Sequence, residues 1–293
     1  MKKDKKYSLR NMIQSPIIKI IIGSMFCILI PILINKLLLD NFFQFLGLNE
    51  NLNRAIRVFI TILILMPFSY YYLFGNLENR EITELRLKNN GKQIIINFIL
   101  SIAIISISFI LLISSGLIKA SFLQFPTNII VNLILIVSFV ITEEIFFRGI
   151  LYRIVENSWG TRIALISSVL VFALLHLGNA NANIISLLSV ATGGAVLGVI
   201  YTYTKNLLMP IAFHFGWNLT QVLLGFGLSG GNEFSNLYIL KLNFSGSDIL
   251  TGGTSGIENS IIAIFILMIL FVVLYKKSSD LDKITFMKKR RNL

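Results

Sequence analysis

The sequence predicts an all-α membrane protein, a bundle of about eight transmembrane helices. Hydrophobic residues make up 55% of the 293 residues, and the mean hydropathy is +0.78. Charged residues make up only 14%, well below the roughly one quarter that is typical of soluble domains. Several apolar runs approach the ~20 residues that a helix needs to cross about 30 Å of hydrocarbon. Together these observations predict a chain embedded in the bilayer.

Eight apolar segments are expected to cross the membrane. In chain order they are residues 17–39, 55–74, 93–117, 128–147, 161–177, 184–203, 207–228 and 260–275. The first is too long for a signal-peptide core and no small-residue cleavage motif follows it, so we expect a retained span, kinked at Pro31. The sixth is rich in Gly and Ala, which let neighbouring backbones approach, so we expect it to be central.

The charge distribution predicts the orientation of the bundle. The formal net charge is +12, and the basic residues lie at the chain ends and in short segments between apolar runs. This pattern fits cytoplasmic loops and anionic headgroups, so we reject nucleic-acid binding. We expect a multi-pass protein of the cell membrane with both termini in the cytoplasm. The single cysteine, Cys27, excludes an internal disulfide and a cysteine-based zinc site.

The chain divides into three regions with no internal repeat and no soluble domain. Residues 1–127 form an N-terminal three-span region, and residues 128–228 form the candidate catalytic core with spans four to seven. Residues 229–293 hold an extracytoplasmic loop, the last span and a basic cytoplasmic tail. The loop, residues 229–259, is rich in Gly, Ser, Asn and Thr, and we expect it to be flexible.

Ionisable residues inside a bilayer are costly and usually functional, and a first group occurs at residues 141–153. Glu143 and Glu144 fall near the expected cytoplasmic end of the fourth span, and adjacent helix positions point about 100° apart. Glu144 and Arg148 are four residues apart, so an ion pair between them is expected. Glu143 is then free to face the bundle interior as a general base. The alternative is an ordinary charged cluster at the membrane interface.

The only two histidines of the chain form the other groups. His176 ends the fifth span with Phe172 one turn earlier, and His214 shares a helix face with Asn218 in the seventh. An imidazole and an amide on one face suit the binding of a carbonyl oxygen or an oxyanion. Taken singly, each histidine could be an ordinary packing residue or an interhelical hydrogen-bond partner. Both histidines and the Glu pair nevertheless lie within about 75 residues, on three helices that can converge on one cavity.

These segments resemble the signature of the CPBP family, the CAAX-protease and bacteriocin-processing enzymes, also called the Abi family. The resemblance covers about residues 128–228. Its motifs here are Glu143-Glu144-Ile-Phe-Phe-Arg148 followed by Gly149, then Phe172-Ala-Leu-Leu-His176, then His214-Phe-Gly-Trp-Asn218. Each motif alone is weak, whereas the complete ordered set is specific.

The resemblance implies an eight-helix intramembrane endopeptidase. Glu143 would activate the hydrolytic water with help from His176, while His214 and Asn218 would stabilise the tetrahedral oxyanion. Supporting or substrate-positioning roles are implied for Glu144, Arg148 and Phe172. A seryl or cysteinyl nucleophile is not required.

A metal-free mechanism is favoured, and no cofactor is expected. A Glu and two His residues form a possible Zn²⁺ ligand set, which stays open as an alternative, but the chain contains no HExxH pair. The expected partners are the lipid bilayer and a peptide or small membrane-protein substrate, such as a bacteriocin or pheromone precursor or a CAAX-like protein. Access is expected from the cytoplasm or the inner leaflet.

Two other functions compete with proteolysis. A non-catalytic membrane scaffold or a bacteriocin self-immunity protein of the same family would tolerate the loss of motif residues, but here none is missing. A transporter or proton pathway also uses intramembrane Glu and His. Related halves and broken midplane helices, which are common in transporters, are not evident in this sequence.

Overall fold

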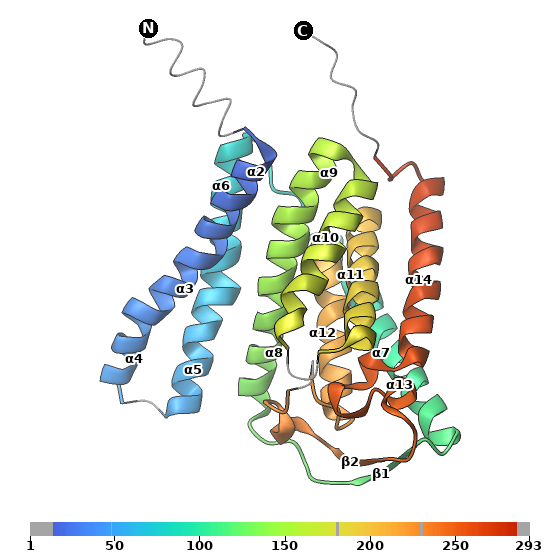
Figure 1. Cartoon of the computed structure of the whole chain (residues 1–293). Helices are drawn as coiled ribbons and strands as arrows, with labels where there is room; N and C mark the ends of the chain where they lie inside the picture. The colour runs from blue at the N-terminus through green and yellow to red at the C-terminus, as the bar shows by residue number, and fades with distance from the viewer. Residues whose placement is uncertain (1–13, 48, 180–181, 229–230, 286–293) are drawn as a thin grey trace, which may run out of the picture.

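The computed structural model describes residues 14–47, 49–179, 182–228 and 231–285, which form a bundle of long helices (Figure 1). The basic stretches from Lys2 to Arg10 and from Lys288 to Arg291, on which the predicted orientation partly depends, lie outside these residues. Seven helices of the described part are long and apolar enough to cross a membrane: Pro16–Phe45, Glu50–Glu78, Gly91–Ser114, Ile129–Trp159, Thr161–Gly178, Ile184–Thr204 and Ile261–Asp280. The predicted all-α multi-pass membrane architecture is confirmed.

The remaining predicted span is a shorter helix. α12 (Leu208–Leu223) has 16 residues, or about 24 Å at the usual helical rise, and packs along α7 (Gly91–Ser114). The sequence predicted that this span continues to Leu228, which is wrong. Gly225 turns the chain with φ +91°, and a Cβ at that position would collide with the carbonyl oxygen of Leu240. Only glycine tolerates both the positive φ and the close approach of the Leu240 carbonyl, so the helix ends before Gly225.

The N-terminal part is a pair of long helices, each interrupted by π-helical turns. The first consists of α2 (Pro16–Ser24), η1 (Met25–Leu29), α3 (Ile30–Ile34), η2 (Asn35–Leu39) and α4 (Asp40–Phe45). The second consists of α5 (Glu50–Val58), η3 (Phe59–Leu65) and α6 (Met66–Glu78). The η1 turn ends two residues before Pro31, whose missing N–H perturbs the helical hydrogen-bond ladder.

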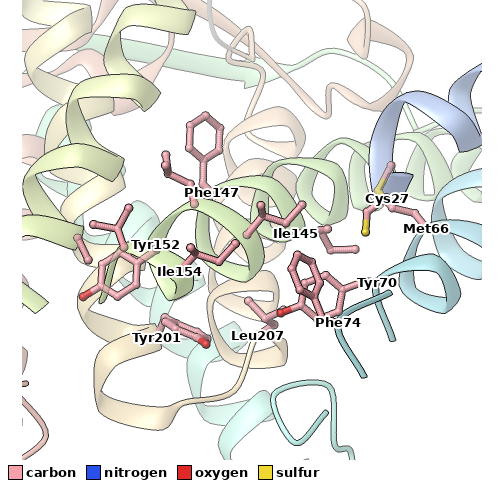
Figure 2. Packing of buried hydrophobic residues seen from close by; sticks show 14 of the residues in the cluster. Cys27, Met66, Tyr70, Phe74, Ile145, Phe147, Tyr152, Ile154, Tyr201 and Leu207 are labelled. Atoms are coloured by element: carbon pink, nitrogen blue, oxygen red, sulfur yellow. The ribbon is translucent and has the colours of Figure 1, made fainter. Parts of the chain in front are cut away.

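A buried apolar cluster joins this pair to the fourth long helix. Cys27, Tyr70 and Phe74 pack there against Ile145 and other side chains of the fourth helix, as Figure 2 shows. Cys27 is fully buried. The cluster fixes the N-terminal pair beside the helix that carries the two glutamates.

That fourth helix is longer than expected. It runs without a break through α8 (Ile129–Glu144), η4 (Ile145–Tyr152) and α9 (Arg153–Trp159). The predicted end at Phe147 is wrong, because the apolar pattern continues past Arg148 and Arg153, which are buried in protein and do not face solvent. Glu143 and Glu144 therefore lie near the middle of this helix and not at a cytoplasmic end.

The other core helices are α10 (Thr161–Leu175), followed by η5 (His176–Gly178), then α11 (Ile184–Thr204), and finally α14 (Ile261–Asp280). The central position predicted for residues 184–203 is confirmed, because half of the membrane-spanning window of α11 is buried, the largest share among the seven. Gly194 lies against Phe172 and Gly198 against Leu165, so the small residues do allow close helix packing.

One end of the bundle is covered by a segment with short regular elements. β1 (Ile118–Phe122) pairs antiparallel with β2 (Leu240–Phe244). The segment that contains β2 also holds α13 (Asp248–Thr251) and three 3₁₀ turns (Ser235–Leu237, Gly253–Ser255, Ile257–Asn259). Phe234, Leu237 and Ile257 are buried against the helices. The expected flexible loop is therefore wrong for its described residues. We call residues 224–228 and 231–260 the closing segment; it lies at the end of the bundle opposite the start of α2 and the end of α14 (Figure 1).

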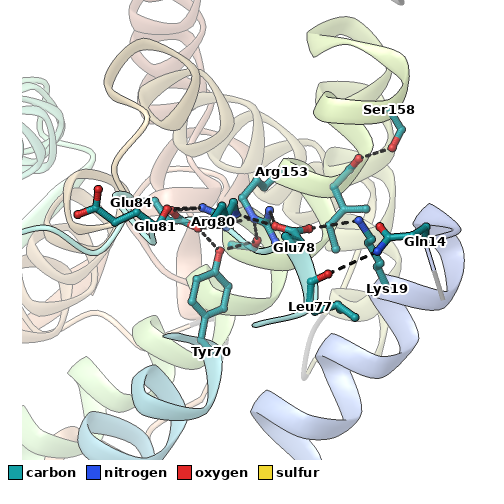
Figure 3. A network of polar contacts seen from close by, with 12 residues as sticks. Gln14, Lys19, Tyr70, Leu77, Glu78, Arg80, Glu81, Glu84, Arg153 and Ser158 are labelled. Atoms are coloured by element: carbon teal, nitrogen blue, oxygen red, sulfur yellow. Dashed lines mark hydrogen bonds and ion pairs between the residues drawn. The ribbon is translucent and has the colours of Figure 1, made fainter. Parts of the chain in front are cut away.

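The other end of the bundle, where α2 begins and α14 ends, holds a network of ion pairs, shown in Figure 3. Arg153 of α9 donates to Glu78 at 2.6 Å, and Arg80 bridges Glu78 and Glu84 at 2.6 Å each. The hydroxyl of Tyr70 lies 2.6 Å from Glu84. The network links α6 and the segment after it to the fourth helix.

Candidate active site

A single cavity of about 400 Å³ brings the sequence-predicted residues together. Glu143, His176, His214 and Asn218 all line it, as does Phe172. The cavity lies between α8, α10, α11 and α12, and residues of the closing segment and Leu267 of α14 complete its wall. Spans four, five and seven therefore converge on one space, together with the central α11.

Glu144 and Arg148 form a buried pair behind this cavity. Both side chains are 0% exposed, and the guanidinium Nη1 lies 2.8 Å from Glu144 Oε1, so the ion pair expected from their spacing is present. Arg148 also donates to the Gly194 carbonyl at 3.0 Å and lies over the Phe172 ring, 5.1 Å from its centroid. The Phe172 ring therefore packs directly on the Arg148 guanidinium.

The same Glu144 oxygen also binds His214. His214 Nδ1 lies 2.9 Å from Glu144 Oε1, so the order Arg148, Glu144, His214 forms a continuous polar chain. Because a carboxylate only accepts hydrogen bonds, Nδ1–H is the donor and the ring orientation is set. The Nε2 atom then points to Glu143, 3.8 Å from its Oε2. Sequence reasoning gave Glu144 one partner and missed this second one.

Glu143 lies where two imidazoles meet. His176 Nε2 is 4.0 Å from Glu143 Oε1, and His214 Nε2 is 3.8 Å from Oε2. Both distances exceed direct hydrogen bonding and are short enough for one water molecule to bridge. The Glu143 side chain is 32% exposed and the two imidazoles 15% and 12%, so the carboxylate is open to the cavity.

The turn at the end of α10 orients His176. Its Nδ1 donates to the Phe172 carbonyl at 2.7 Å, which leaves Nε2 as the acceptor in the neutral ring. The rings of His176 and Phe172 also lie 4.4 Å apart between centroids. The Phe-x-x-x-His spacing thus holds the imidazole through its own helix, and a single residue, Phe172, positions both His176 and Arg148.

Further cavity residues were not found from the sequence. Trp217, one position before Asn218, donates to Glu258 at 3.3 Å, and Gln221 donates to the same oxygen at 3.2 Å. The Glu258 carbonyl accepts from Ser189 of α11 at 2.5 Å. Glu258 and Glu233 both line the cavity. No motif pointed to them, because they lie in the closing segment that we expected to be flexible.

The donor set does not favour a metal centre. Within the described residues, no group of three or more His, Cys, Asp or Glu side chains is arranged to hold a metal ion. Glu143, His176 and His214 do share the cavity, and the separations between their carboxylate and imidazole atoms suit hydrogen bonding through a shared water molecule.

Comparison with known proteins gives a match over the region that holds this site. The family model of Rce1-like proteins, described as type II CAAX prenyl endopeptidase Rce1-like, matches residues 124–220, about a third of the chain. No curated protein and no solved structure matched the chain. The matched region begins just before α8 and ends within α12, so it contains every motif residue named above. The resemblance predicted from the sequence is therefore confirmed over residues 124–220, which match the CAAX-protease family model and contain the candidate site.

Proposed function

We propose that this chain is an intramembrane endopeptidase that hydrolyses a peptide bond in a membrane-associated peptide through a glutamate-activated water. The observation that carries the proposal is the convergence of Glu143, His176, His214 and Asn218 on one cavity inside the bundle. A carboxylate, two oriented imidazoles and an amide supply the base, the acid and the oxyanion donors that hydrolysis needs. Scaffolding or immunity alone would not need this arrangement.

Water activation falls to Glu143 and His176. A water molecule between Glu143 Oε1 and His176 Nε2, which are 4.0 Å apart, would meet two acceptors at once. Glu143 takes one proton, and the resulting hydroxide attacks the carbonyl carbon of the scissile bond. The carbonyl oxygen becomes the oxyanion of a tetrahedral intermediate. As the C–N bond breaks, the proton held by Glu143 passes to the departing amine.

Oxyanion stabilisation falls to His214 and Asn218. With both ring nitrogens protonated, His214 donates through Nδ1 to Glu144 and through Nε2 to the oxyanion. The Asn218 amide, four residues later on α12, supplies the second donor. Glu144 and Arg148 touch no substrate in this scheme; they are positioning residues that act through His214.

The proposed topology changes the expected route of access. We infer that the protein resides in the cell membrane with both termini in the cytoplasm, because basic residues concentrate on that side. The closing segment then lies on the outer side, and the cavity extends from the middle of the fourth helix toward that segment. Substrates would enter from the bilayer or the outer face, not from the cytoplasm as the sequence suggested. Peptide precursors and membrane-anchored peptides remain the proposed substrates.

Comparative peptidomics of membranes tests the proposal. We expect fragments that are present with the intact protein and absent with Glu143→Gln or His176→Ala, at equal membrane abundance of all three proteins. Full cleavage by either variant would refute the catalytic assignment. A chelator titration of the purified protein tests the metal question, and loss of activity restored by Zn²⁺ would refute the metal-free mechanism. Protection of cells by all three proteins without any cleavage would instead support an immunity function.

A further inference from the structure

The charge of the cavity suggests which substrates it accepts. Three carboxylates line it, those of Glu143, Glu233 and Glu258. Among the described residues, none of the lysines or arginines lines it, and the nearby Arg148 is paired with Glu144 behind the wall. The one cation that the proposed mechanism places in the cavity, protonated His214, is bonded to Glu144, so the carboxylates of the lining still outnumber it. The remaining lining is largely apolar and aromatic. We propose that the cavity selects an apolar peptide that carries a cationic group beside the scissile bond. This rests on the proposed function and specifies its substrate class.

The position of Glu258 supports this assignment. Its carboxylate accepts from Trp217 and Gln221 of α12, and its backbone carbonyl accepts from Ser189 of α11. Trp217 is next to Asn218 and three residues from His214, so its indole links Glu258 to the helix that carries both oxyanion donors, and all four residues line the same cavity. A cationic group at Glu258 would therefore lie close to the bond that is cleaved.

Glu233 lies on a different side of the cavity. The neighbouring Phe234 packs edge-on against Phe139 of α8, with ring centroids 6.3 Å apart, and Phe139 lies one turn before Glu143. The Glu233 side chain is exposed and also borders a small second pocket. The closing segment thus contributes one carboxylate near α8 and another near α11 and α12.

The carboxylates discriminate between peptides by the charge that each peptide carries beside the scissile bond. An ammonium or guanidinium group is attracted to the carboxylates and to the aromatic ring faces, and this attraction offsets the hydration free energy that the cation loses on leaving water. A peptide whose carboxylate lies beside the scissile bond would meet like charges and is disfavoured. The cationic group can be a Lys or Arg side chain or a free N-terminal amine.

A binding assay tests the charge preference apart from catalysis. The full chain carrying His176→Ala, which keeps all three carboxylates, is purified in neutral dodecylmaltoside micelles. The probes are short, fluorescent, Leu- and Ala-rich peptides, acetylated and amidated, which differ only in one central residue: Lys, norleucine or Glu. We expect the Lys peptide to bind about tenfold or more tightly than the norleucine peptide at low salt, and the Glu peptide to bind most weakly. Equal binding of the three peptides would overturn the proposal.

Matched variants assign the effect to the cavity. In the same background, Glu258→Gln should remove most of the Lys preference and Glu233→Gln a smaller part. Asp248→Asn should leave it unchanged, because Asp248 is an exposed acid of the same closing segment that does not line the cavity. A preference that survives both Gln substitutions would overturn the proposal. If Glu258→Gln fails to fold, Glu233→Gln still decides the question, since its side chain is exposed.

Two further experiments complete the test. The first distinguishes a Lys side chain from a free N-terminal amine, and the second distinguishes the charge preference from the proposed proteolysis. A norleucine peptide with a free N-terminus, compared with its acetylated form, shows whether an α-amine replaces the Lys side chain. The wild-type chain is then given the Lys peptide, and the products are analysed by mass spectrometry. Tight Lys-dependent binding without any cleavage would refute the proposed proteolysis and leave the charge preference standing.

Discussion

Removal of the Arg148 guanidinium should destabilise the protein more than removal of any exposed cation. In Arg148→Met, Glu144 keeps only His214 as a partner, and its Oε2 already has no hydrogen-bond partner. Both members of the pair are 0% exposed, so water cannot replace the lost contact. Breaking a buried pair on one side typically costs about 3–5 kcal/mol. The lost hydrogen bond to the Gly194 carbonyl adds about 1 kcal/mol.

The matched control is Arg86→Met. Arg86 pairs with Glu81, but their side chains are 50% and 67% exposed, so this substitution should cost at most about 1 kcal/mol. Both variants are compared with the wild type by SDS-induced unfolding in mixed micelles, followed by tryptophan fluorescence. Equal stabilities of Arg148→Met and Arg86→Met would refute the assignment of Arg148 as a buried structural cation.

Two additional variants separate charge from geometry. Arg148→Lys keeps the charge but loses the planar fork that reaches Glu144 and Gly194 together, so its stability should be intermediate. The double variant with Glu144→Gln should be less destabilised than the sum of the single variants, because no unpaired carboxylate remains. Strict additivity would show that the two side chains are not coupled.

Two more predictions concern helix packing and pH. Gly216→Ala should destabilise the contact between α12 and α7 by about 1–3 kcal/mol, because its Cβ would lie 2.9 Å from the Phe98 carbonyl oxygen. Gly193→Ala is the neutral control, because a Cβ at that position would have nothing within 4 Å. Equal free energies of unfolding for the two variants would contradict the prediction. Burial alone raises the pKa of Glu84, but hydrogen bonds from Arg80 and Tyr70 outweigh it and lower the pKa from its usual 4.5 to about 2. The stability contributed by Glu84 is therefore complete above about pH 4.5 and lost as pH falls toward 2, so the Tm difference between wild type and Glu84→Gln should shrink on acidification; a constant difference would exclude this carboxyl as the cause.

Much of the candidate site was predictable because its residues are costly where they occur. Glu143, Glu144 and both histidines lie in apolar segments, where an ionisable side chain needs a compensating partner or a function. The four-residue spacing predicted the pair of Glu144 with Arg148 correctly, because helical geometry alone brings these side chains together. The same rule explains how Phe172 holds His176 through its carbonyl group.

Long-range contacts were not predictable in this way. No spacing rule joins Glu144 to His214, which are 70 residues apart and meet only because α8 and α12 pack together. The length of the fourth helix was underestimated because Arg148 and Arg153 resembled an interfacial boundary, whereas the fold buries both. The closing segment resembled a flexible loop, although Phe234, Leu237 and Ile257 anchor it to the bundle.

By itself, the sequence determined the membrane class, the approximate spans and the set of ionisable residues, because hydropathy and helical periodicity are local properties of the chain. Only the tertiary structure decided that Glu143 faces two imidazoles, that Glu144 orients His214, and that Glu233 and Glu258 complete the cavity wall. These contacts depend on how helices cross and how a Gly-rich segment folds back on them. That packing is set by the summed fit of many side chains, and no short motif encodes it.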